Sequence, residues 1–500
     1  MSHSLGGLLA GQDAEIRGDT ATPIRDLCYD SRRLRPGDLF VALRGQNTDG
    51  HHYLDAASEA GAAALLVEEF PSEVFGDVPI ARIADTRSAL AEVAACFFGS
   101  PAERMTLIGV TGTNGKTSTV RIIESILRQA RHPVGAIDTV SFRFAGEEEP
   151  STLTTPESLD LQRTLARMRA AGVDRVVLEV SSHSIVLERV RTLRFACGVF
   201  TQLSQDHLDF HGDMEAYGRA KGALFAPPYL AGSAVLNADD RWSRHYAESA
   251  RGAGLPVLWF GRGSQSPTAA GSDLDLRSVE EQVGLDASRF VVESKGRRYE
   301  LSLPLPGDFQ IDNALAAVAT ALALGIPWNL ISDGLAATPP IPGRLEAVSR
   351  EPAVLVDYAH TPDALDRVLS RVRPLVRGRL ITVFGCGGNR DRSKRAPMAA
   401  AACRHSDYVI ATSDNPRTER AEKILDDLRE GLDGDHEVIV DRREAIRRAI
   451  AIATAQDTVV IAGKGHENYQ ILGQDRVPFD DREEARKGLA LRYGEREQTP

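Results

Sequence analysis

The chain has 500 residues with a formal net charge of −11 at pH 7, and 42% of its residues are apolar. This length predicts about three domains, and the composition is ordinary for a soluble globular protein. The acidic balance argues against a nucleic-acid backbone as the main partner, and no run approaches the roughly 20 apolar residues that a membrane span needs.

The cysteines and the first residues indicate a reducing compartment. None of the five cysteines stands in a CxxC pair, so we interpret them as small buried side chains and not as a disulfide or zinc framework. The opening segment, residues 1–11, lacks the basic start and long apolar core of a signal peptide. We therefore expect a cytoplasmic protein.

The first predicted domain covers residues 1–99. Within it, Leu39–Leu43 predicts a strand, Ala56–Ala64 an alanine-rich helix and Ala64–Val67 a second strand. The segment Gly99-Ser100-Pro101 has the composition of a linker, and we place the domain boundary there.

A glycine-rich turn follows the linker. The apolar strand that starts at Leu107 runs into Thr111-Gly-Thr-Asn-Gly-Lys-Thr117, and apolar residues at helical spacing come next. A strand, a turn and a helix N-terminus in this order form a cradle whose backbone N–H groups face phosphate. Lys116 can reach the terminal phosphates, and the Thr117 hydroxyl can ligate Mg²⁺. A tight turn of a Rossmann-like unit is the alternative. Because Val110 stands where the common P-loop has glycine, we predict a nucleoside triphosphate site of an unusual subtype.

Strands and helices alternate through the second predicted domain, residues 100–337, which favours a mostly parallel sheet with helical crossovers. Glu179 lies in the apolar strand Arg175–Val180, where a lone acid is costly unless it is paired or binds a metal. We predict that Glu179 is a Mg²⁺ ligand opposite Thr117. A strand-end carboxylate that caps a turn is the alternative.

Two further features of this domain have no decided role from the residues alone. The segment Ser204–Gly212 holds two acids and two histidines, but no cysteine or suitably spaced third ligand supports a zinc site. A polar surface turn explains the segment equally well. Lys221 lies on the predicted helix Met214–Phe225, where a lysine is by default a solvated surface charge.

The third predicted domain covers residues 338–500 and begins with Thr338-Pro-Pro-Ile-Pro-Gly343, whose prolines resist helix. Three strands then each run into a polar turn, and in open α/β sheets ligands gather at the carboxyl ends of strands. These strands are Val354–Asp357, Leu380–Phe384 and Val459–Ala462.

The turn Asp414-Asn-Pro-Arg417 follows a fourth predicted strand, Tyr408–Ala411. Asn-Pro is a turn signal, and a plain turn is one interpretation. The other is that Arg417 offers a bidentate fork to a carboxylate while Asp414 meets an ammonium group. Such a pair suits an amino-acid zwitterion.

Six motifs occur in order over nearly the whole chain, and together they resemble the Mur ligases of bacterial cell-wall synthesis. They are Thr111-Gly-Thr-Asn-Gly-Lys-Thr117, Glu179-Val-Ser-Ser-His183, Asp206-His-Leu-Asp-Phe-His-Gly212, Gly343-Arg-Leu-Glu346, Asp357-Tyr-Ala-His-Thr-Pro362 and Gly463-Lys-Gly-His-Glu467. Folylpolyglutamate and cyanophycin synthetases share the first motif, whereas the ordered set is specific. The Asp-Asn-Pro-Arg turn is typical of the branch that adds meso-diaminopimelate, and the lysine-adding branch lacks its arginine.

The resemblance implies an α/β fold of three domains, with a P-loop-like central parallel sheet and a Rossmann-like C-terminal domain. In chain order these would bind the UDP end of the acceptor, ATP and the incoming amino acid. ATP contacts are implied for Gly112, Thr113, Asn114, Gly115, Lys116, Thr117, Ser118, Asn313, Arg344, Asp357 and His360. Acceptor contacts are implied for Ser31, Thr154, Thr155, Ser181 and Arg189. Diaminopimelate contacts are implied for Arg390, Asp414, Asn415, Pro416, Arg417, Gly463 and Glu467.

The resemblance also implies the catalytic and metal-binding groups. It assigns catalysis to Lys116, His207 and Lys221, and Mg²⁺ ligation to Thr117, Glu179, His207 and Lys221. Lys221 matches a lysine that this family carbamylates with CO₂, so the implied modification turns a cation into an anion and reverses the surface interpretation. Leu187, Gln310 and Ser413 stand where relatives often carry glutamine, asparagine and aspartate, and we assign no polar substrate contact to Leu187.

The implied reaction is ATP-driven amide formation. The D-glutamate carboxylate of UDP-N-acetylmuramoyl-L-alanyl-D-glutamate becomes an acyl phosphate, which the amino group of meso-diaminopimelate attacks. We expect a monomer, with the segment 338–343 as the hinge of a closure that keeps water from the acyl phosphate. Two other classes stay open. A folate-glutamate ligase would need neither the Asp-Asn-Pro-Arg turn nor a UDP-binding domain, and a nucleotide switch would hydrolyse ATP or GTP without an acceptor.

Overall fold

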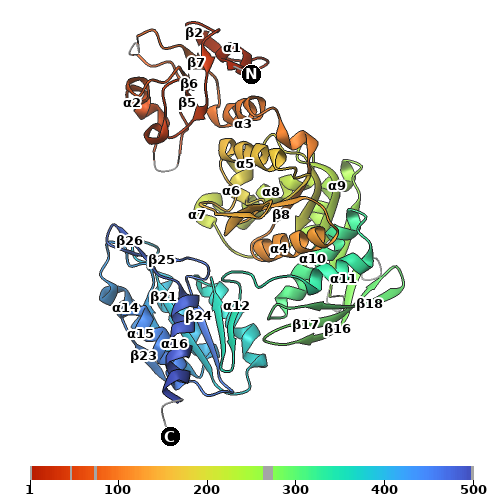
Figure 1. Cartoon of the computed structure of the whole chain (residues 1–500), viewed down its shortest axis with the longest axis vertical. Coiled ribbons are helices and arrows are strands. Elements are labelled where there is room, and N and C mark those ends of the chain that lie inside the picture. The colour runs from red at the N-terminus through yellow and green to blue at the C-terminus, as the bar shows by residue number, and fades with distance from the viewer. Residues whose placement is uncertain (1–2, 46–47, 73–75, 263–273, 497–500) are drawn as a thin grey trace. The chain divides into compact units, whose positions relative to one another are not determined.

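The computed structural model describes residues 3–45, 48–72, 76–262 and 274–496 (Figure 1). The chain divides into two compact units: a first unit of residues 1–275 with 316–327, and a second unit of residues 276–315 with 328–500. The predicted boundaries at 99/100 and 337/338 stay predictions. Within the described ranges, no helix combines the length and the apolarity that crossing a membrane requires.

The N-terminal part of the first unit is a five-stranded sheet. Its order is β2 (Glu15–Arg17), β7 (Ile80–Arg82), β6 (Ala64–Val67), β5 (Leu39–Val41) and β4 (Leu27–Cys28). Helix α3 (Thr86–Phe97) packs on one face and α2 (Leu54–Glu59) on the other. The predicted strand β6 is confirmed. Strand β5 and helix α2 are shorter than predicted, and α2 ends just before Gly61, whose φ of +87° is a left-handed helix stop.

The main sheet of the first unit is parallel from β9 to β15, as predicted, with an antiparallel hairpin at one edge. Its order is β11 (Glu147–Pro150), β10 (Ser141–Phe144), β9 (Val134–Ile137), β12 (Arg175–Glu179), β8 (Thr106–Thr111), β13 (Phe195–Phe200), β14 (Leu230–Asn237) and β15 (Val257–Gly261). The predicted strand at Arg175 is confirmed as β12.

Two helices cover this sheet from opposite sides. Helix α4 (Lys116–Gln129) follows β8 directly, and Figure 1 shows it across β8 from α5 (Ser158–Ala170). The predicted helix at Met214 is α8 (Met214–Gly222), which ends earlier than expected because a 3₁₀ turn replaces its last residues. Three shorter helices complete the layers: α6 (Ser182–Val186), α7 (Leu208–His211) and α9 (Ser243–Gly252).

The second unit opens with an antiparallel meander that the sequence patterns did not predict. It consists of β16 (Leu276–Val283), β17 (Ser288–Ser294) and β18 (Arg297–Leu303), and α10 (Phe309–Ala323) follows it. Helix α11 (Trp328–Ala336) packs on β18 by stacking Trp328 on Tyr299, with ring centroids 3.7 Å apart. The segment 338–343 then carries neither helix nor strand, as its prolines predict.

The C-terminal sheet is parallel apart from its first strand. Its order is β19 (Glu346–Arg350), β20 (Ala353–Asp357), β24 (Thr458–Ala462), β21 (Leu380–Cys386), β22 (Tyr408–Ser413) and β23 (His436–Val438). Alternate residues of β20 face opposite helix layers: Leu355 packs with α12 (Pro362–Val372), α13 (Arg395–His405) and α14 (Ala421–Arg429), and Val354 packs with α15 (Arg442–Ile452) and α16 (Asp481–Arg496). The four strands predicted here are confirmed within two residues at each end.

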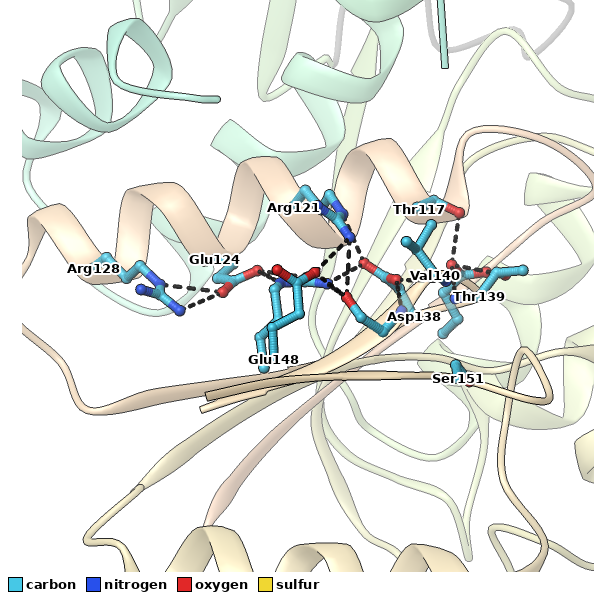
Figure 2. A network of polar contacts seen from close by, with 12 residues as sticks. Thr117, Arg121, Glu124, Arg128, Asp138, Thr139, Val140, Glu148 and Ser151 are labelled. Carbon is cyan, nitrogen blue, oxygen red and sulfur yellow. Dashed lines mark hydrogen bonds and ion pairs between the residues drawn. The ribbon is translucent and has the colours of Figure 1, made fainter. Parts of the chain in front are cut away.

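A buried ion network lies beside α4 in the first unit (Figure 2). Asp138 accepts a hydrogen bond from Arg121 Nε at 2.9 Å and pairs with Arg143 Nη1 at 2.8 Å, and Arg143 Nη2 also reaches Glu124 at 2.6 Å. Burial alone would raise the pKa of Asp138, but Arg143 and then Arg121 outweigh it, so the pKa lies below its ordinary value. Two cations and two anions cancel, which makes the burial tolerable.

Replacing Asp138 by asparagine should lower the free energy of unfolding by about 3–5 kcal/mol at pH 7, because two buried guanidinium groups would keep a single buried carboxylate, Glu124, with the exposed Glu148 3.7 Å from Arg121. Since the folded-state pKa of Asp138 is lowered, its contribution is present at neutral pH and is lost as the pH falls below about 4. Urea unfolding at neutral pH and at acidic pH measures the change in the free energy of unfolding.

The control is Glu149→Gln, which removes an exposed partner of Arg167 and should change the free energy of unfolding by no more than about 1 kcal/mol. Equal losses in the two variants at pH 7 would contradict the role given to Asp138.

Candidate active site

The phosphate loop connects β8 to α4 through two glycines with positive φ. Gly112 has a φ of +149°, and a Cβ there would lie 1.9 Å from Thr201 Oγ1. Gly115, with a φ of +85°, is the N-cap of α4 and brings no side-chain oxygen to its first turn. The first turn is therefore free of a side-chain cap, as in helices that receive an anion at this end.

The loop is held from the segment that follows β13. Thr201 Oγ1 donates to Asn114 O at 2.6 Å, and Thr113 Oγ1 accepts from Ser204 N at 3.0 Å. Thr113 Oγ1 also lies 3.2 Å from the hydroxyl of Tyr217 on α8. Thr201 and Tyr217 are site residues that sequence reasoning missed, since isolated threonines and tyrosines carry no motif.

Lys116 bends back over the loop that it terminates. Its Nζ donates to Gly112 O at 3.0 Å and to Thr113 O at 2.9 Å. The ammonium group therefore lies against the backbone of the phosphate loop, and its contact with a terminal phosphate stays a prediction.

Glu179 and Thr117 meet directly. The Thr117 hydroxyl donates to Glu179 Oε1 at 2.7 Å, and Thr139 donates to the same oxygen through its backbone N–H at 3.0 Å. Glu179 is fully buried, and its carboxylate accepts hydrogen bonds from the neutral groups of Thr117 and Thr139. Burying a carboxylate is costly, and its oxygens with the Thr117 hydroxyl are the hard donors that Mg²⁺ takes. The residues fit a magnesium site.

Lys221 is 1% exposed, so the surface interpretation of this helical lysine is wrong. Its Nζ donates to Gly112 O at 2.9 Å and lies over the Tyr217 ring. Burial, followed by the nearby charge of Lys116, holds its pKa well below the ordinary value. The amine beside the phosphate loop is therefore much easier to deprotonate than a surface lysine.

Three histidines pack beside this lysine as an aromatic cluster. The His183 ring stacks on Phe210 at 4.1 Å and meets His207 edge-on at 4.7 Å, and His211 Nε2 lies 2.9 Å from Ser182 Oγ. Burial, with His207 and His211 nearby, lowers the pKa of His183 to about 4. In the part of the chain that the structure describes, no group of three or more His, Cys, Asp or Glu residues is placed to hold a metal ion, so the zinc interpretation gains no support.

The predicted acceptor residues converge on the carboxyl end of β12. Thr155 Oγ1 donates to Glu179 O at 2.8 Å and accepts from Ser181 N at 3.2 Å, while Arg189 Nη1 donates to Thr155 O at 3.0 Å. Thr154 joins them through Thr139, at 3.1 Å between hydroxyl oxygens. Two residues stand apart from this set: Ser31 begins a 3₁₀ turn capped by Asp30, and Leu187 ends α6.

In the second unit, the turn after β22 holds residues that the sequence predicts to bind an amino acid. Asp414 Oδ1 accepts from Asn415 N at 2.6 Å, and a Cβ on Gly463 would lie 2.9 Å from Asp414 Oδ2. Arg417 has a φ of +55° and donates from Nη1 to Gly388 O at 2.9 Å. A non-glycine residue held in the left-handed region is strained, a feature that clusters at ligand sites.

A buried lysine, Lys464, organises two of these residues. Its Nζ donates to Asn415 Oδ1 and to Glu467 Oε2, both at 3.1 Å, and Asn415 Nδ2 donates to Glu467 Oε2 at 3.0 Å. The three side chains thus fix one another. Arg390 is exposed, on the loop after β21, and Pro416 lies in the turn itself.

Ser413 and Gln310, which depart from the family pattern, have internal partners. Ser413 Oγ accepts from Gln470 Nε2 at 3.1 Å, and Gln310 Oε1 accepts from Asn313 Nδ2 at 2.9 Å. The buried Arg442 supports the same edge of the sheet: it pairs with Asp481 at 2.7 Å and donates to Ala462 O, next to Gly463, at 2.9 Å.

Three of the predicted nucleotide residues of the second unit, Arg344, Asp357 and His360, lie around the end of β20, while Asn313 lies on α10. Asp357 accepts from Leu345 N at 2.7 Å and Ala359 N at 2.8 Å, and burial raises its pKa against the opposing effect of Arg344. Arg344 lies over the Tyr358 ring at 5.2 Å. His360 is exposed and its Nδ1 lies 2.8 Å from Tyr358 O.

Comparison with known proteins gives matches along the whole chain. Family models match at residues 23–98 (Mur ligase family, catalytic domain), 110–321 (Mur ligase middle domain) and 343–465 (Mur ligase, glutamate ligase domain). A Gloeobacter violaceus protein named UDP-N-acetylmuramoyl-L-alanyl-D-glutamate–2,6-diaminopimelate ligase is 45% identical, covering 97% of this chain and 98% of its own. A solved structure of the same name is 32% identical with a TM-score of 0.70, covering 99% of this chain and 100% of its own. The Thermotoga maritima MurF ligase in complex with ADP shares the fold, with 17% identity and a TM-score of 0.63 over 94% of this chain and 98% of its own.

Replacing Gly112 by alanine should abolish nucleotide binding, because the new Cβ would collide with Thr201 and displace the loop. Titration calorimetry with ADP measures the loss. Gly146→Ala is the matched control, since Gly146 also has a positive φ of +85° but a Cβ there meets nothing within 4 Å. Retained ADP affinity in Gly112→Ala would show that the loop does not hold the nucleotide.

Proposed function

The chain belongs to the Mur ligase family, and we propose that it is the ligase that adds meso-diaminopimelate to UDP-N-acetylmuramoyl-L-alanyl-D-glutamate at the expense of ATP, in peptidoglycan synthesis. Full-length similarity to ligases of this name, at 45% identity for the Gloeobacter violaceus protein, carries the assignment. The amino-acid site around Asp414 and Arg417 supports it independently.

The phosphate loop from Gly112 to Ser118 is the ATP site of the first unit, with Lys116 against the terminal phosphates. Thr117 and Glu179 would hold Mg²⁺, which offsets phosphate charge when bound, and we place His207 and Lys221 beside it. In the second unit, Asn313, Arg344, Asp357 and His360 are proposed nucleotide contacts. Catalysis by these groups consists of positioning and charge stabilisation.

Amide formation takes two balanced steps. An oxygen of the D-glutamate carboxylate attacks the γ-phosphorus, the bond from that phosphorus to the bridging oxygen breaks, and ADP leaves with the electron pair. The neutral amine of diaminopimelate then attacks the acyl carbon of the resulting acyl phosphate. The carbon–oxygen bond breaks, phosphate leaves, and the nitrogen loses a proton as the amide forms. Thr154, Thr155, Ser181 and Arg189 are the proposed acceptor contacts, with Ser31 at the uridine end.

The site in the second unit suits an amino acid whose side chain ends in both an ammonium group and a carboxylate group. The carboxylates of Asp414 and Glu467 match an ammonium group, and the guanidinium group of Arg417 matches a carboxylate. Lysine has the far ammonium group but lacks the far carboxylate, so it would leave Arg417 without its partner. A site built to bind a polar group strongly rejects an analogue that lacks this group.

Lys221 is proposed to act as a carbamate. A deprotonated amine attacks CO₂, a C–N bond forms, one C=O π bond opens and leaves its electron pair on that oxygen, and one amine proton passes to solvent. The lowered pKa of Lys221 makes that amine available. The product is an anion near Lys116, so the unfavourable contact between the two amines becomes an attraction and a further oxygen ligand for a cation appears.

We also propose that the protein works as a monomer in the cytoplasm, without a nucleic-acid partner. The acidic balance supports the absence of a nucleic-acid partner, and the absence of a paired cysteine motif in the sequence supports a cytoplasmic location.

Purified protein with Mg-ATP and UDP-N-acetylmuramoyl-L-alanyl-D-glutamate should release ADP when meso-diaminopimelate is added, and not with L-lysine. Arg417→Ala should lower kcat/KM for diaminopimelate roughly a hundredfold, because a charge-assisted pair is lost. A coupled ADP assay measures both. The control is Arg420→Ala, a nearby exposed arginine. Turnover with lysine would remove the specificity argument, and no turnover with either would sink the proposed reaction.

Carbamylation should appear as a ¹³C resonance when the protein is equilibrated with ¹³C-bicarbonate at pH 8. Lys221→Met should lose the resonance and most ligase activity, whereas Lys423→Met, on the exposed side of α14, should keep both. The signal should fade as the pH is lowered, because protonation of the amine removes the form that reacts with CO₂. Equal signals in wild type and Lys221→Met would contradict the assignment.

A further inference from the structure

Thr139 occupies a position between two groups of the candidate active site. Its backbone N–H donates to Glu179 Oε1 at 3.0 Å. Its hydroxyl lies 3.1 Å from both Glu179 oxygens and 3.1 Å from the hydroxyl of Thr154. No sequence motif includes Thr139, yet it contacts both the proposed metal ligand and the proposed acceptor loop.

We propose that Thr139 is a positioning residue that couples acceptor binding at Thr154 to the Glu179 carboxylate. This inference rests on the proposed function, because it takes Thr154 as an acceptor contact and Glu179 as a ligand of the nucleotide-bound cation.

The coupling follows from the single proton that the Thr139 hydroxyl group can donate. A hydroxyl group has one proton to donate, and the Thr139 hydroxyl faces three oxygens at equal distance. It therefore has two exclusive arrangements, one donating to Glu179 and one donating to Thr154. An element with two discrete arrangements that both sites bias is what energetic coupling requires.

The rest of the turn is too firmly held to move instead. Asp138 Oδ1 accepts from Val140 N at 2.8 Å and Ser141 N at 3.0 Å, the two backbone N–H groups that follow Thr139. The other carboxylate oxygen of Asp138 is held by Arg121 and Arg143. Figure 2 shows this network continuing from the ions beside α4 to Thr139 and Thr117. With the backbone fixed, rotation of the hydroxyl is the remaining freedom.

The geometry also gives the direction of the effect. When the Thr154 hydroxyl donates a hydrogen bond to an oxygen of the bound acceptor substrate, the Thr154 oxygen accepts a hydrogen bond from Thr139 more strongly. The reason is that hydrogen bonds in a chain polarise one another. The Thr139 proton then turns away from Glu179 and leaves the carboxylate oxygens more available to a cation. Acceptor and Mg-nucleotide should therefore strengthen each other's binding, and by the same factor in both directions.

The test is calorimetric titration with UDP-N-acetylmuramoyl-L-alanyl-D-glutamate, with and without Mg²⁺ and a non-hydrolysable ATP analogue, and with no amino acid present. Wild type should bind the acceptor about fivefold or more tightly when the Mg-nucleotide is bound. Thr139→Val, which keeps the shape and the backbone N–H, should reduce that factor to near one. Thr139→Ser, which restores the hydroxyl, should recover it.

Two further measurements separate coupling from damage to the fold. Thr164→Val is the matched control, since its buried hydroxyl donates only to Asp160 O within α5 and should leave the factor unchanged. Mn²⁺ binding to the nucleotide-free protein, followed by its paramagnetic resonance, reads the metal site without turnover. In wild type, added acceptor should raise the Mn²⁺ affinity. In Thr139→Val this response should be lost. Should the valine variant melt early, Thr139→Ala replaces it.

The outcomes distinguish the two levels of the argument. If wild type fails to bind the UDP acceptor at all, the proposed function falls. If wild type binds it and Thr139→Val keeps the full coupling factor, or Thr139→Ser fails to restore it, the inference about Thr139 falls while the proposed function stands.

Discussion

The buried carboxylate of Glu179 is the constraint on which the first unit depends. A charge at the end of a fully buried strand is costly unless every oxygen has a partner. The chain meets this requirement with neutral donors from two segments, Thr117 on the phosphate loop and Thr139 after β9, while Thr155 of the acceptor loop donates to the backbone carbonyl of Glu179. The same contacts bring the phosphate loop and the acceptor loop to one point, so that the solution of a burial problem also assembles a site.

Two groups of charged side chains lie around this point, and they affect the fold in opposite ways. Asp138 and Glu124 neutralise Arg121 and Arg143 and give a rigid support. Lys116 and Lys221 both donate to Gly112 O on the phosphate loop, and Lys221 is buried. The first arrangement stabilises the fold, whereas the second is electrostatically unfavourable until an anion arrives. A site that receives triphosphate is expected to have this imbalance.

The second unit solves a similar problem with a different set of residues. Hydrogen bonds fix Asn415, Lys464 and Glu467 to one another. Arg442 donates a hydrogen bond to the backbone carbonyl of Ala462 and so holds this part of the backbone. Glycine at 463 leaves room for Asp414, which a Cβ would displace. Glu467 and the backbone before Gly463 are thus held by Lys464 and Arg442, two buried cations that are not among the proposed ligand contacts. Preorganisation of this kind lets a site discriminate between amino acids that differ at one end.

The amino-acid sequence by itself determined the elements and the chemistry that depends on neighbours along the chain. The phosphate loop, the parallel strands and the Asp-Asn-Pro-Arg turn are all local patterns, because glycine, proline and apolar spacing act within a few residues. The meander from β16 to β18 was missed, since its strands lack the apolar pattern of the buried ones. Only the tertiary structure decided which long-range partners each side chain has. It buried Lys221, placed Thr139 between Glu179 and Thr154, and put Lys464 between Asn415 and Glu467. The physical reason is that burial and hydrogen bonding between distant segments arise when the sheets and helices pack, and no spacing along the chain encodes them.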